Sequence, residues 1–464
     1  MSGIFGVVSR KSCVESLFYG VDYHSHLGTQ FAGLAVWGRT LNKKIHDISR
    51  SQFKSKFFEE LRDLKGKKGI GVISTQNPQP IVVSSKFGLY AICTNGFIDN
   101  ARKLAKGLLK NGESFSDSFR GQINTTELVA KLINKAQTIE EGIEKMFSKI
   151  DGSISLLILT KKGVWAARDR FGYTPLVVGE KEDEFAITTE TTAFLNLGFK
   201  IKKFLSPSEI IFIDERGIKQ KNKGKDKNQI CAFLWIYAGF PASSYEGVNV
   251  EIVRERCGRL LARSDNIKID LVSGVPDSGT THAIGYAMES KTPFRRPLVK
   301  YTPGFDRSYT PPSQTTRNLI AKMKLVAVRE IIENKRIILC EDSIVRGTQL
   351  KNFTIQKLWE NGAKEIHLRI ACPPLLFPCK FNYSTRSTSE LIGRRAIRVI
   401  EKKDIEDVSK YLDEKSISYK KMVSWIAKEL NVTSLRYQRL SDMVSAIGLP
   451  GENLCLYCWT GESV

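Results

Sequence analysis

One stretch of this 464-residue chain narrows the choice of fold more than any other, the segment Ile337–Thr348, IILCEDSIVRGT. Its first four residues are apolar and predict a buried β-strand. Two acids, Glu341 and Asp342, stand at the carboxyl end of that strand, and Ser343–Thr348 then form a turn that enters a helix. A strand followed by a turn and a helix is the repeating unit of parallel α/β sheets, which bind ligands at the carboxyl ends of their strands.

The same succession of strand, turn and helix repeats through the second half of the chain and predicts an α/β domain built on a parallel sheet. Both Gly-containing turns of this half follow directly after a predicted strand, so both should lie at the ligand-binding edge. The predicted elements are a helix at Glu251–Arg263, a strand at Ile267–Val272, a turn at Ser273–Thr280, a helix at His282–Met288, and strands at Arg336–Cys340 and Ile366–Ala371.

The first half consists of short β-rich runs separated by Gly and polar turns, with helical patterns at Asn100–Lys110 and Thr125–Ala136. This predicts an α+β domain of antiparallel sheets with flanking helices. Because 464 residues exceed one ordinary core, we expect two domains, residues 1–227 and 228–464. The β-rich runs are Ile4–Val8, Ala32–Trp37, Gly69–Ser74, Pro80–Val83, Leu89–Cys93, Ser153–Thr160, Gly163–Ala167 and Phe185–Thr188.

The net charge of +22 has two interpretations, an anionic partner or a lysine-rich solvated surface. The lysines are scattered, which favours the solvated surface, and no motif typical of nucleic-acid binding is present. The densest cluster, Lys219–Lys227, is polar and predicts a loop or linker. We find no apolar run of about 20 residues and no secretory signal, so we expect a cytoplasmic protein without membrane spans.

The chemistry of Ile337–Thr348 suits a phosphorylated ribose. Glu341 and Asp342 can hold ribose hydroxyls or a hydrated Mg²⁺. The backbone N–H groups of the turn and the start of the helix suit a phosphate. The hydroxyls of Ser343 and Thr348 add donors, and Gly347 permits close approach of the backbone.

This segment resembles the phosphoribosyl-pyrophosphate motif of the type I phosphoribosyltransferases. The most similar motif is DDSIVRGT, that of the glutamine phosphoribosylpyrophosphate amidotransferase family of purine biosynthesis, with Glu341 in place of its first Asp. Gly274–Thr280 and Ala283–Ala287 also match that family. The resemblance implies Mg²⁺ at Ser278, Glu341 and Asp342. It places phosphoribosyl pyrophosphate at Asp277, Ser278, Gly279, Lys300, Arg307, Asp342, Ser343, Val345, Arg346, Gly347 and Thr348.

One segment before the flexible catalytic loop departs from the family. The segment Arg307–Arg317 resembles the catalytic loop of the family. The family has the sequence KNRY before this loop, whereas this chain has Lys300–Pro303, in which only the lysine matches. This change puts the handling of pyrophosphate, or the transfer of ammonia, in doubt.

Four of the nine cysteines fall where one branch of the family binds an iron–sulfur cluster, namely Cys231, Cys379, Cys455 and Cys458. Four thiolates can hold a 4Fe–4S cluster. The resemblance therefore implies a structural cluster, and the alternative is four unrelated core cysteines. Disulfides are not expected in a cytoplasmic chain.

The N-terminus resembles a class II glutamine amidotransferase domain, which has the N-terminal-nucleophile fold. In that family the first residue after the initiator Met is a nucleophilic cysteine, and here it is Ser2, whose hydroxyl is a weaker nucleophile. The pair that stabilises the oxyanion is kept as Asn95 and Gly96.

The anchors for glutamine are both lost. The arginine that holds the α-carboxylate is Val72 here, and the aspartate that holds the α-amino group is Thr125. Each buried ion pair lost from a pocket costs about 2–5 kcal/mol. We therefore predict that the glutaminase half is inactive.

Three functions remain open from the sequence. The first is a phosphoribosyltransferase that forms phosphoribosylamine from free ammonia or from ammonia supplied by a partner. The second is a non-catalytic paralogue that binds the phosphoribosyl ligand and regulates or scaffolds a homologous active subunit. The third is an enzyme that uses Ser2 on glutamine or another amide. The resemblance implies a homo-oligomer in each case.

Overall fold

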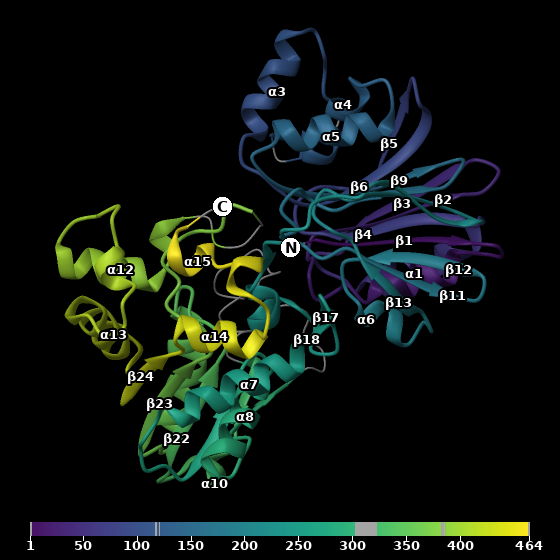
Figure 1. Ribbon diagram of the computed structural model, residues 1–464. Helices are drawn as coiled ribbons and strands as arrows, with labels where there is room; N and C mark the ends of the chain where they lie inside the picture. Colours follow the sequence, from purple (N-terminus) through teal and green to yellow (C-terminus); the bar gives the residue numbers. More distant parts are fainter. Residues whose placement is uncertain are drawn as a thin grey trace. The chain divides into compact units, whose positions relative to one another are not determined.

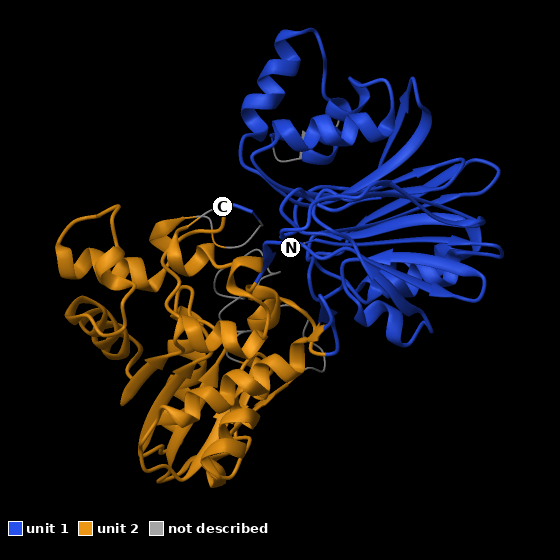
Figure 2. Ribbon diagram, in the orientation of Figure 1, with its two compact units in different colours: residues 1–231, 242–247, 380–383 blue, residues 232–241, 248–379, 384–464 orange. Residues whose placement is uncertain are grey.

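The computed structural model describes residues 2–116, 118–119, 121–301, 323–381, 385 and 387–462. The chain divides into two compact units (Figure 2). Unit 1 comprises residues 1–231, 242–247 and 380–383, and unit 2 comprises residues 232–241, 248–379 and 384–464. Within the described residues, no helix has both the length and the apolar character needed to cross a bilayer.

Unit 1 is built on two antiparallel sheets packed face to face, as predicted for the first half (Figure 1). In the described residues the first sheet has the order β13 (Lys200–Phe204), β11 (Val177–Lys181), β12 (Glu184–Thr188), β1 (Gly3–Ser9), β4 (Lys68–Ser74), β2 (Phe31–Trp37) and β3 (Leu41–Asp47). The second has the order β15 (Gly217–Asn222), β14 (Ile210–Asp214), β10 (Val164–Ala167), β9 (Gly152–Thr160), β6 (Gly88–Ile98) and β5 (Ile81–Ser85).

Three apolar clusters hold these layers together. One lies between the sheets and joins residues such as Ile4 and Ile70 to Leu157 and Ile213, all buried. The second packs α1 (Val14–Asp22) and α6 (Thr192–Leu195) on the first sheet. The third packs α3 (Ala101–Lys110), α4 (Thr125–Asn134) and α5 (Ile139–Lys149) on the second. Central strands such as β1 and β9 are apolar on both faces because each face meets a packed layer.

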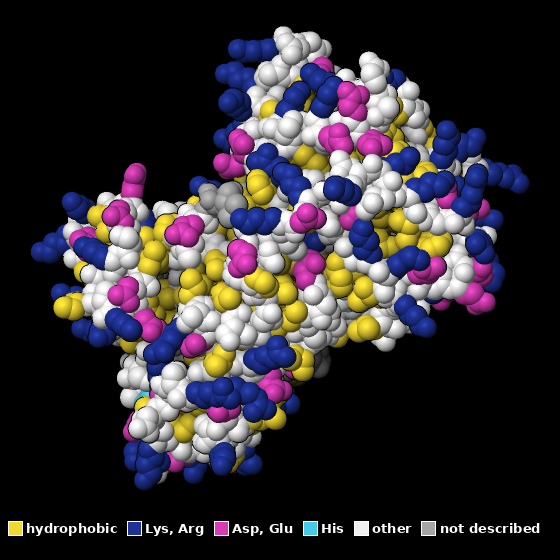
Figure 3. Space-filling view, viewed as in Figure 1, with side chains coloured by type: hydrophobic (Ala, Val, Ile, Leu, Met, Phe, Trp, Pro, Cys, Tyr) yellow, Lys and Arg dark blue, Asp and Glu magenta, His cyan; other side chains and the backbone are white. Residues whose placement is uncertain are grey.

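The lysine run at Lys219–Lys227 was expected to be a loop, and this is wrong for its first part. Lys219–Asn222 belong to β15, an edge strand that pairs with β14 alone in the described chain. Charged residues, lysine above all, are common on edge strands because they discourage pairing with other chains. Elsewhere Lys and Arg are spread over the visible surface with Asp and Glu among them (Figure 3).

Unit 2 contains the predicted parallel sheet. Its order is β19 (Leu271–Gly274), β22 (Arg336–Glu341), β23 (Glu365–Ile370) and β24 (Ser434–Tyr437), and all pairs are parallel. The strand expected at Ile267–Val272 begins later, at Leu271. The helices and helical turns are α7 (Val250–Arg263), α8 (Thr280–Ser290), α10 (Arg329–Ile332), η3 (Leu350–Ile355), α11 (Gln356–Glu360), α12 (Ile392–Glu401), α13 (Ile417–Leu430), α14 (Leu440–Ile447) and α15 (Tyr457–Thr460).

Local sequence explains where the long helices of unit 2 begin and end. The side chain of Asn249 accepts a hydrogen bond from Ile252 N at 3.1 Å and caps α7. Ser416 caps α13 in the same way through Tyr419 N at 3.0 Å. The helix α13 ends at Asn431, which takes the left-handed conformation that Asn tolerates better than most residues. The short turn to Ser434 then places β24 beside β23.

Two helical glycines of unit 1 give a matched test of this packing. A Cβ at Gly142 in α5 would lie 2.4 Å from Ile133 O, whereas a Cβ at Gly107 in α3 would meet nothing within 4 Å. We expect Gly142→Ala to destabilise unit 1 by about 1–3 kcal/mol through overpacking. Gly107→Ala should stabilise it by about 0.5–1 kcal/mol. Urea denaturation followed by circular dichroism measures both, and equal shifts of the two midpoints would contradict this packing.

Candidate functional site

The predicted ligand edge of unit 2 is formed where two loops meet at the ends of β19 and β22. The strands pair in parallel with Gly274 opposite Cys340. Val275 N–H donates to Cys340 O at 2.9 Å, and a Cβ at Gly279 would lie 2.1 Å from the same carbonyl. Gly279 is therefore required, because any side chain would push the loop off the strand.

The close contact of the loop after β19 with the end of β22 brings together the three residues predicted to hold a metal ion. Ser278 Oγ donates to Glu341 Oε1 at 2.6 Å, and Asp342 N–H donates to the same oxygen at 2.9 Å. The hydroxyl of Ser343 donates to Asp342 Oδ1. Glu341 is 8% exposed and Asp342 4%, so two carboxyl groups share one buried place.

The electrostatics of this pair favour a cation. Burial and the neighbouring Asp342 raise the pKa of Glu341 well above its usual range. Burial also raises the pKa of Asp342. A divalent cation would offset both effects, because it stabilises the ionised form of each carboxylate. Carboxylate and hydroxyl oxygens are the donors that Mg²⁺ prefers, so these residues fit that ion.

The turn after the acid pair is held from outside by the segment that begins α12. Ile392 N–H donates to Val345 O at 2.7 Å, and Arg346 forms an ion pair with Glu390. Gly347 has φ of +77°, a conformation that L side chains rarely adopt. Thr348 follows at the start of the helical segment that continues into η3. No sequence pattern predicted the supporting role of Glu390 and Ile392, which lie more than 40 residues further along the chain.

The remaining predicted ligands of this site are partly described. Lys300 Nζ lies 2.7 Å from Asp277 Oδ2, so the lysine retained from the family contacts the loop that follows β19. Arg307 lies outside the described residues, as does the whole segment Arg307–Arg317.

In unit 1, the predicted nucleophile position lies beside the predicted oxyanion pair. Ser2 N–H donates to Asn95 Oδ1 at 3.2 Å, and both residues are buried. Gly96 has φ of +136°, and a Cβ there would lie 1.9 Å from Ser153 O. The close pairing of β6 with β9 therefore requires a glycine at position 96.

The two positions predicted to have lost a charged anchor, Val72 and Thr125, have uncharged contacts. Val72 is fully buried in the apolar cluster between the sheets. Thr125 Oγ1 accepts a hydrogen bond from Asn77 Nδ2 at 2.8 Å. Next to Asn95, the Thr94 and Thr126 hydroxyls lie 2.7 Å apart, and Gln79 Oε1 accepts from Thr94 N at 2.8 Å.

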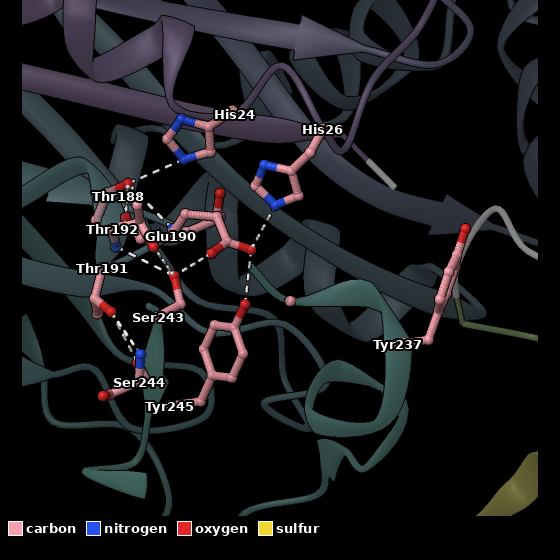
Figure 4. A network of polar contacts seen from close by, with 12 residues as sticks. His24, His26, Thr188, Glu190, Thr191, Thr192, Tyr237, Ser243, Ser244 and Tyr245 are labelled. Carbon is pink, nitrogen blue, oxygen red and sulfur yellow. Dashed lines mark hydrogen bonds and ion pairs between the residues drawn. The ribbon is translucent and has the colours of Figure 1, made fainter. Parts of the chain in front are cut away.

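A polar network supports the N-terminal strand from behind (Figure 4). The buried carboxylate of Glu190 accepts hydrogen bonds from Ser243 Oγ and, at 2.7 Å, from Tyr245 OH, and Glu190 Oε1 lies 3.4 Å from His26 Nε2. Thr188 Oγ1 lies 3.0 Å from His24 Nε2, and a Cβ at Gly3 would lie 2.4 Å from the His24 ring. Burial lowers the pKa of His24 to about 4, so this imidazole is neutral near pH 7. No sequence pattern predicted this network.

The predicted iron–sulfur ligands do not form a metal site in the structure. Backbone contacts do bring their segments close, because Cys458 O accepts from Leu376 N and Phe377 N at 3.1 and 3.2 Å, and Ala232 N donates to Cys455 O at 3.3 Å. Yet among the described residues no group of three or more Cys, His, Asp or Glu could hold a metal ion. The expectation of a cluster at Cys231, Cys379, Cys455 and Cys458 is not supported. The spacing of the cysteines in the sequence predicts that their backbone segments lie close together. It does not predict the directions in which the four thiols point.

The two units define a class of protein: an N-terminal-nucleophile domain of the class II amidotransferase type, followed by a type I phosphoribosyltransferase domain. A family model described as "Glutamine amidotransferase domain" matches residues 68–196. The solved structure of glutamine phosphoribosylpyrophosphate amidotransferase from B. subtilis, complexed with ADP and GMP, superposes with a TM-score of 0.85 and 29% identity, covering 99% of this chain and 96% of that one.

Curated relatives agree over the full length. The amidophosphoribosyltransferase of Methanocaldococcus jannaschii is 32% identical over 100% of this chain and 97% of its own. That of Bacillus subtilis is 29% identical over 99% and 93%. The chain belongs to the amidophosphoribosyltransferase family, a family of glycosyltransferases.

The acid pair predicts how the stability of unit 2 depends on pH. The folded pKa of Glu341 is raised, so the folded state holds this proton more tightly than the unfolded chain does. Stability is then present below the ordinary pKa of a glutamate and is lost as the pH rises through the raised value. We expect the unfolding midpoint to fall by roughly 3 °C or more between pH 5 and 8.

Thermal denaturation with and without Mg²⁺ measures this effect. Added Mg²⁺ should restore the midpoint at pH 8 and change it little at pH 5, because protons and the cation compete for the same carboxylates. Glu341→Gln should flatten the pH profile and remove the response to Mg²⁺. A profile that is the same in this variant and in the unaltered chain would contradict the assignment.

Proposed function

We propose that the chain binds phosphoribosyl pyrophosphate with Mg²⁺ in unit 2 and forms phosphoribosylamine from ammonia, as an enzyme of purine biosynthesis. The observation that carries the proposal is the contact of Ser278 with the Glu341–Asp342 pair, beside a turn held open by Gly347. Family membership and the match to an enzyme titled "the allosteric regulatory enzyme of purine biosynthesis", with a TM-score of 0.85 at 29% identity, support it.

Different residues of unit 2 would bind the metal ion, the 5′-phosphate and the pyrophosphate of the substrate. Glu341, Asp342 and Ser278 would hold Mg²⁺, which when bound neutralises charge on the leaving pyrophosphate. Ser343–Thr348 would hold the 5′-phosphate through backbone N–H groups at the start of a helix. The loop Val275–Gly279, with Lys300 beside Asp277, would grip the pyrophosphate. Catalysis then consists largely of positioning C1 of the ribose for attack by ammonia.

The glutaminase half is proposed to be inactive. Ser2 is a weaker nucleophile than cysteine, and the apolar packing of Val72 leaves no charge for the α-carboxylate of glutamine at that position. Thr125 is engaged by Asn77, so its hydroxyl offers a substrate ammonium far less than an aspartate would. The ammonia would therefore come from solution or from a partner glutaminase.

The altered segment at Lys300–Pro303 favours a second candidate, a non-catalytic homologue that binds the phosphoribosyl ligand and regulates an active subunit. We also propose domain extents of 1–227 and 228–464, supported by the compact units, whose main division follows Cys231. A homo-oligomer remains a prediction from the family. No step of this function depends on an iron–sulfur cluster.

One assay separates the candidates. Purified protein is given phosphoribosyl pyrophosphate and Mg²⁺ with either ammonium or glutamine at pH about 8.5, and pyrophosphate release is measured. We expect turnover with ammonium and a rate at least roughly 100-fold lower with glutamine, because the nucleophile and both anchors are changed. Asp342→Asn should lower the ammonium-dependent rate by roughly 100-fold.

Ser2→Ala is the matched control and should leave the ammonium-dependent rate within about twofold. Glutamate release at a rate close to that of pyrophosphate would overturn the inactive glutaminase. Tight binding of phosphoribosyl pyrophosphate without turnover on either nitrogen source would favour the regulatory homologue instead.

A further inference from the structure

A hollow of about 550 Å³ lies in unit 2 between α13 and the edge strand β24. Its volume falls in the range of small-molecule sites, about 300–1,000 Å³. It lies on the far side of β23 from β22, so it is not part of the acid-pair site. The function proposed above makes no use of it.

Tyr419 and Tyr437 are the aromatic residues in the lining of the hollow. Tyr437, the last residue of β24, is 5% exposed, and its hydroxyl is buried without a hydrogen-bond partner among the described residues. Tyr419 of α13 lines the same hollow. Burial raises the pKa of Tyr437 well above its usual range, and the neighbouring Tyr419 and Cys372 raise it further. The Tyr437 phenol is therefore protonated and keeps an unused donor.

The rim of the hollow is cationic. Lys415, Lys420, Arg436 and Arg439 line it, and Glu414 is the one acid among the lining residues. Glu414 already forms an ion pair with Arg439, with Nε 3.0 Å from Oε1. In the described part of the chain, neither Lys415 nor Lys420 has an acidic partner within 4 Å. The lining of the hollow therefore carries an excess of positive charge.

We propose that this hollow binds a phosphorylated small molecule of about the size of a sugar phosphate or a mononucleotide. Lys415 and Lys420 take the phosphate at the rim, since ammonium groups bind phosphates as compact point charges. The ring of Tyr419 provides an apolar face for the rest of the ligand, and Tyr437 lies beside it in the lining of the hollow. A carboxylate is less well matched, because it is smaller than the space and carries less charge.

The hollow is connected to the acid pair through the sheet. Tyr437 pairs with Ile370 of β23, and the next residue, Ala371, donates its N–H to Glu341 O at 2.9 Å. Cys372 follows Ala371 and lies close enough to Asp342 and Glu341 for both to raise its pKa, although burial is the larger cause. A ligand that moves Tyr437 can therefore affect Glu341 through two neighbouring residues, Ile370 and Ala371.

Fluorine NMR on protein labelled with 3-fluorotyrosine tests the proposal, with ribose 5-phosphate as the probe at constant ionic strength. The resonances of Tyr419 and Tyr437 are assigned with Tyr419→Phe and Tyr437→Phe. We expect both resonances to shift along one saturable curve. The double variant Lys415→Ala/Lys420→Ala should weaken that curve at least tenfold, because two charge-assisted contacts are lost.

Lys421→Ala/Lys428→Ala is the matched control. It removes two charges from the exposed side of the same helix, outside the hollow, and should leave the curve unchanged. Equal weakening in both double variants would show a non-specific charge effect and overturn the proposal. Tyrosine shifts that disappear in Asp342→Asn but persist in Lys415→Ala/Lys420→Ala would assign the binding to the acid-pair site and overturn it as well.

Discussion

The contact of the loop after β19 with the end of β22 is the interaction on which the candidate site depends. It needs a glycine at position 279, because the carbonyl of Cys340 lies where a Cβ would be. With that contact made, Ser278 reaches Glu341, and two carboxyl groups that repel each other are held in one buried place. The parallel register of β19 and β22 sets all of this geometry, so a shift of either strand by one residue would separate the groups.

The two units treat charge in opposite ways. Unit 2 buries an unfavourable acid pair, which is costly unless a cation joins it, and such cost is typical of functional sites. Unit 1 instead pairs neutral hydroxyls and amides with one another, as in the contacts of Thr125 with Asn77 and of Thr94 with Thr126. A pocket whose polar groups are already paired gains little from a charged substrate, because binding must first break those bonds.

Sequence patterns predicted the layers of both units and the acid pair well, because these depend on local periodicity and on the carboxyl ends of strands. The edge strand β15 was missed because its lysines have no apolar partner to mark them as β-structure. The network around Glu190 was missed because Ser243 and Tyr245 reach it from more than 50 residues away. The iron–sulfur cluster stays a prediction from the resemblance, since among the described residues no group of three or more Cys, His, Asp or Glu could hold a metal ion. The pattern located the backbone of the four residues, but a metal site is decided by the directions of the side chains, which no spacing reveals.

The path of the chain between the units has a practical consequence. Residues 242–247 return to unit 1, where Ser243 and Tyr245 donate to Glu190, after ten residues that belong to unit 2. A fragment cut after Cys231 would therefore leave the buried Glu190 carboxylate without two of its donors, and an uncompensated buried charge is strongly destabilising. Evolution could not have exchanged either unit by a single crossover near residue 231 without supplying a new partner for that glutamate. The boundary between the two units is thus interleaved along the chain, so neither unit can be inherited as one uninterrupted segment.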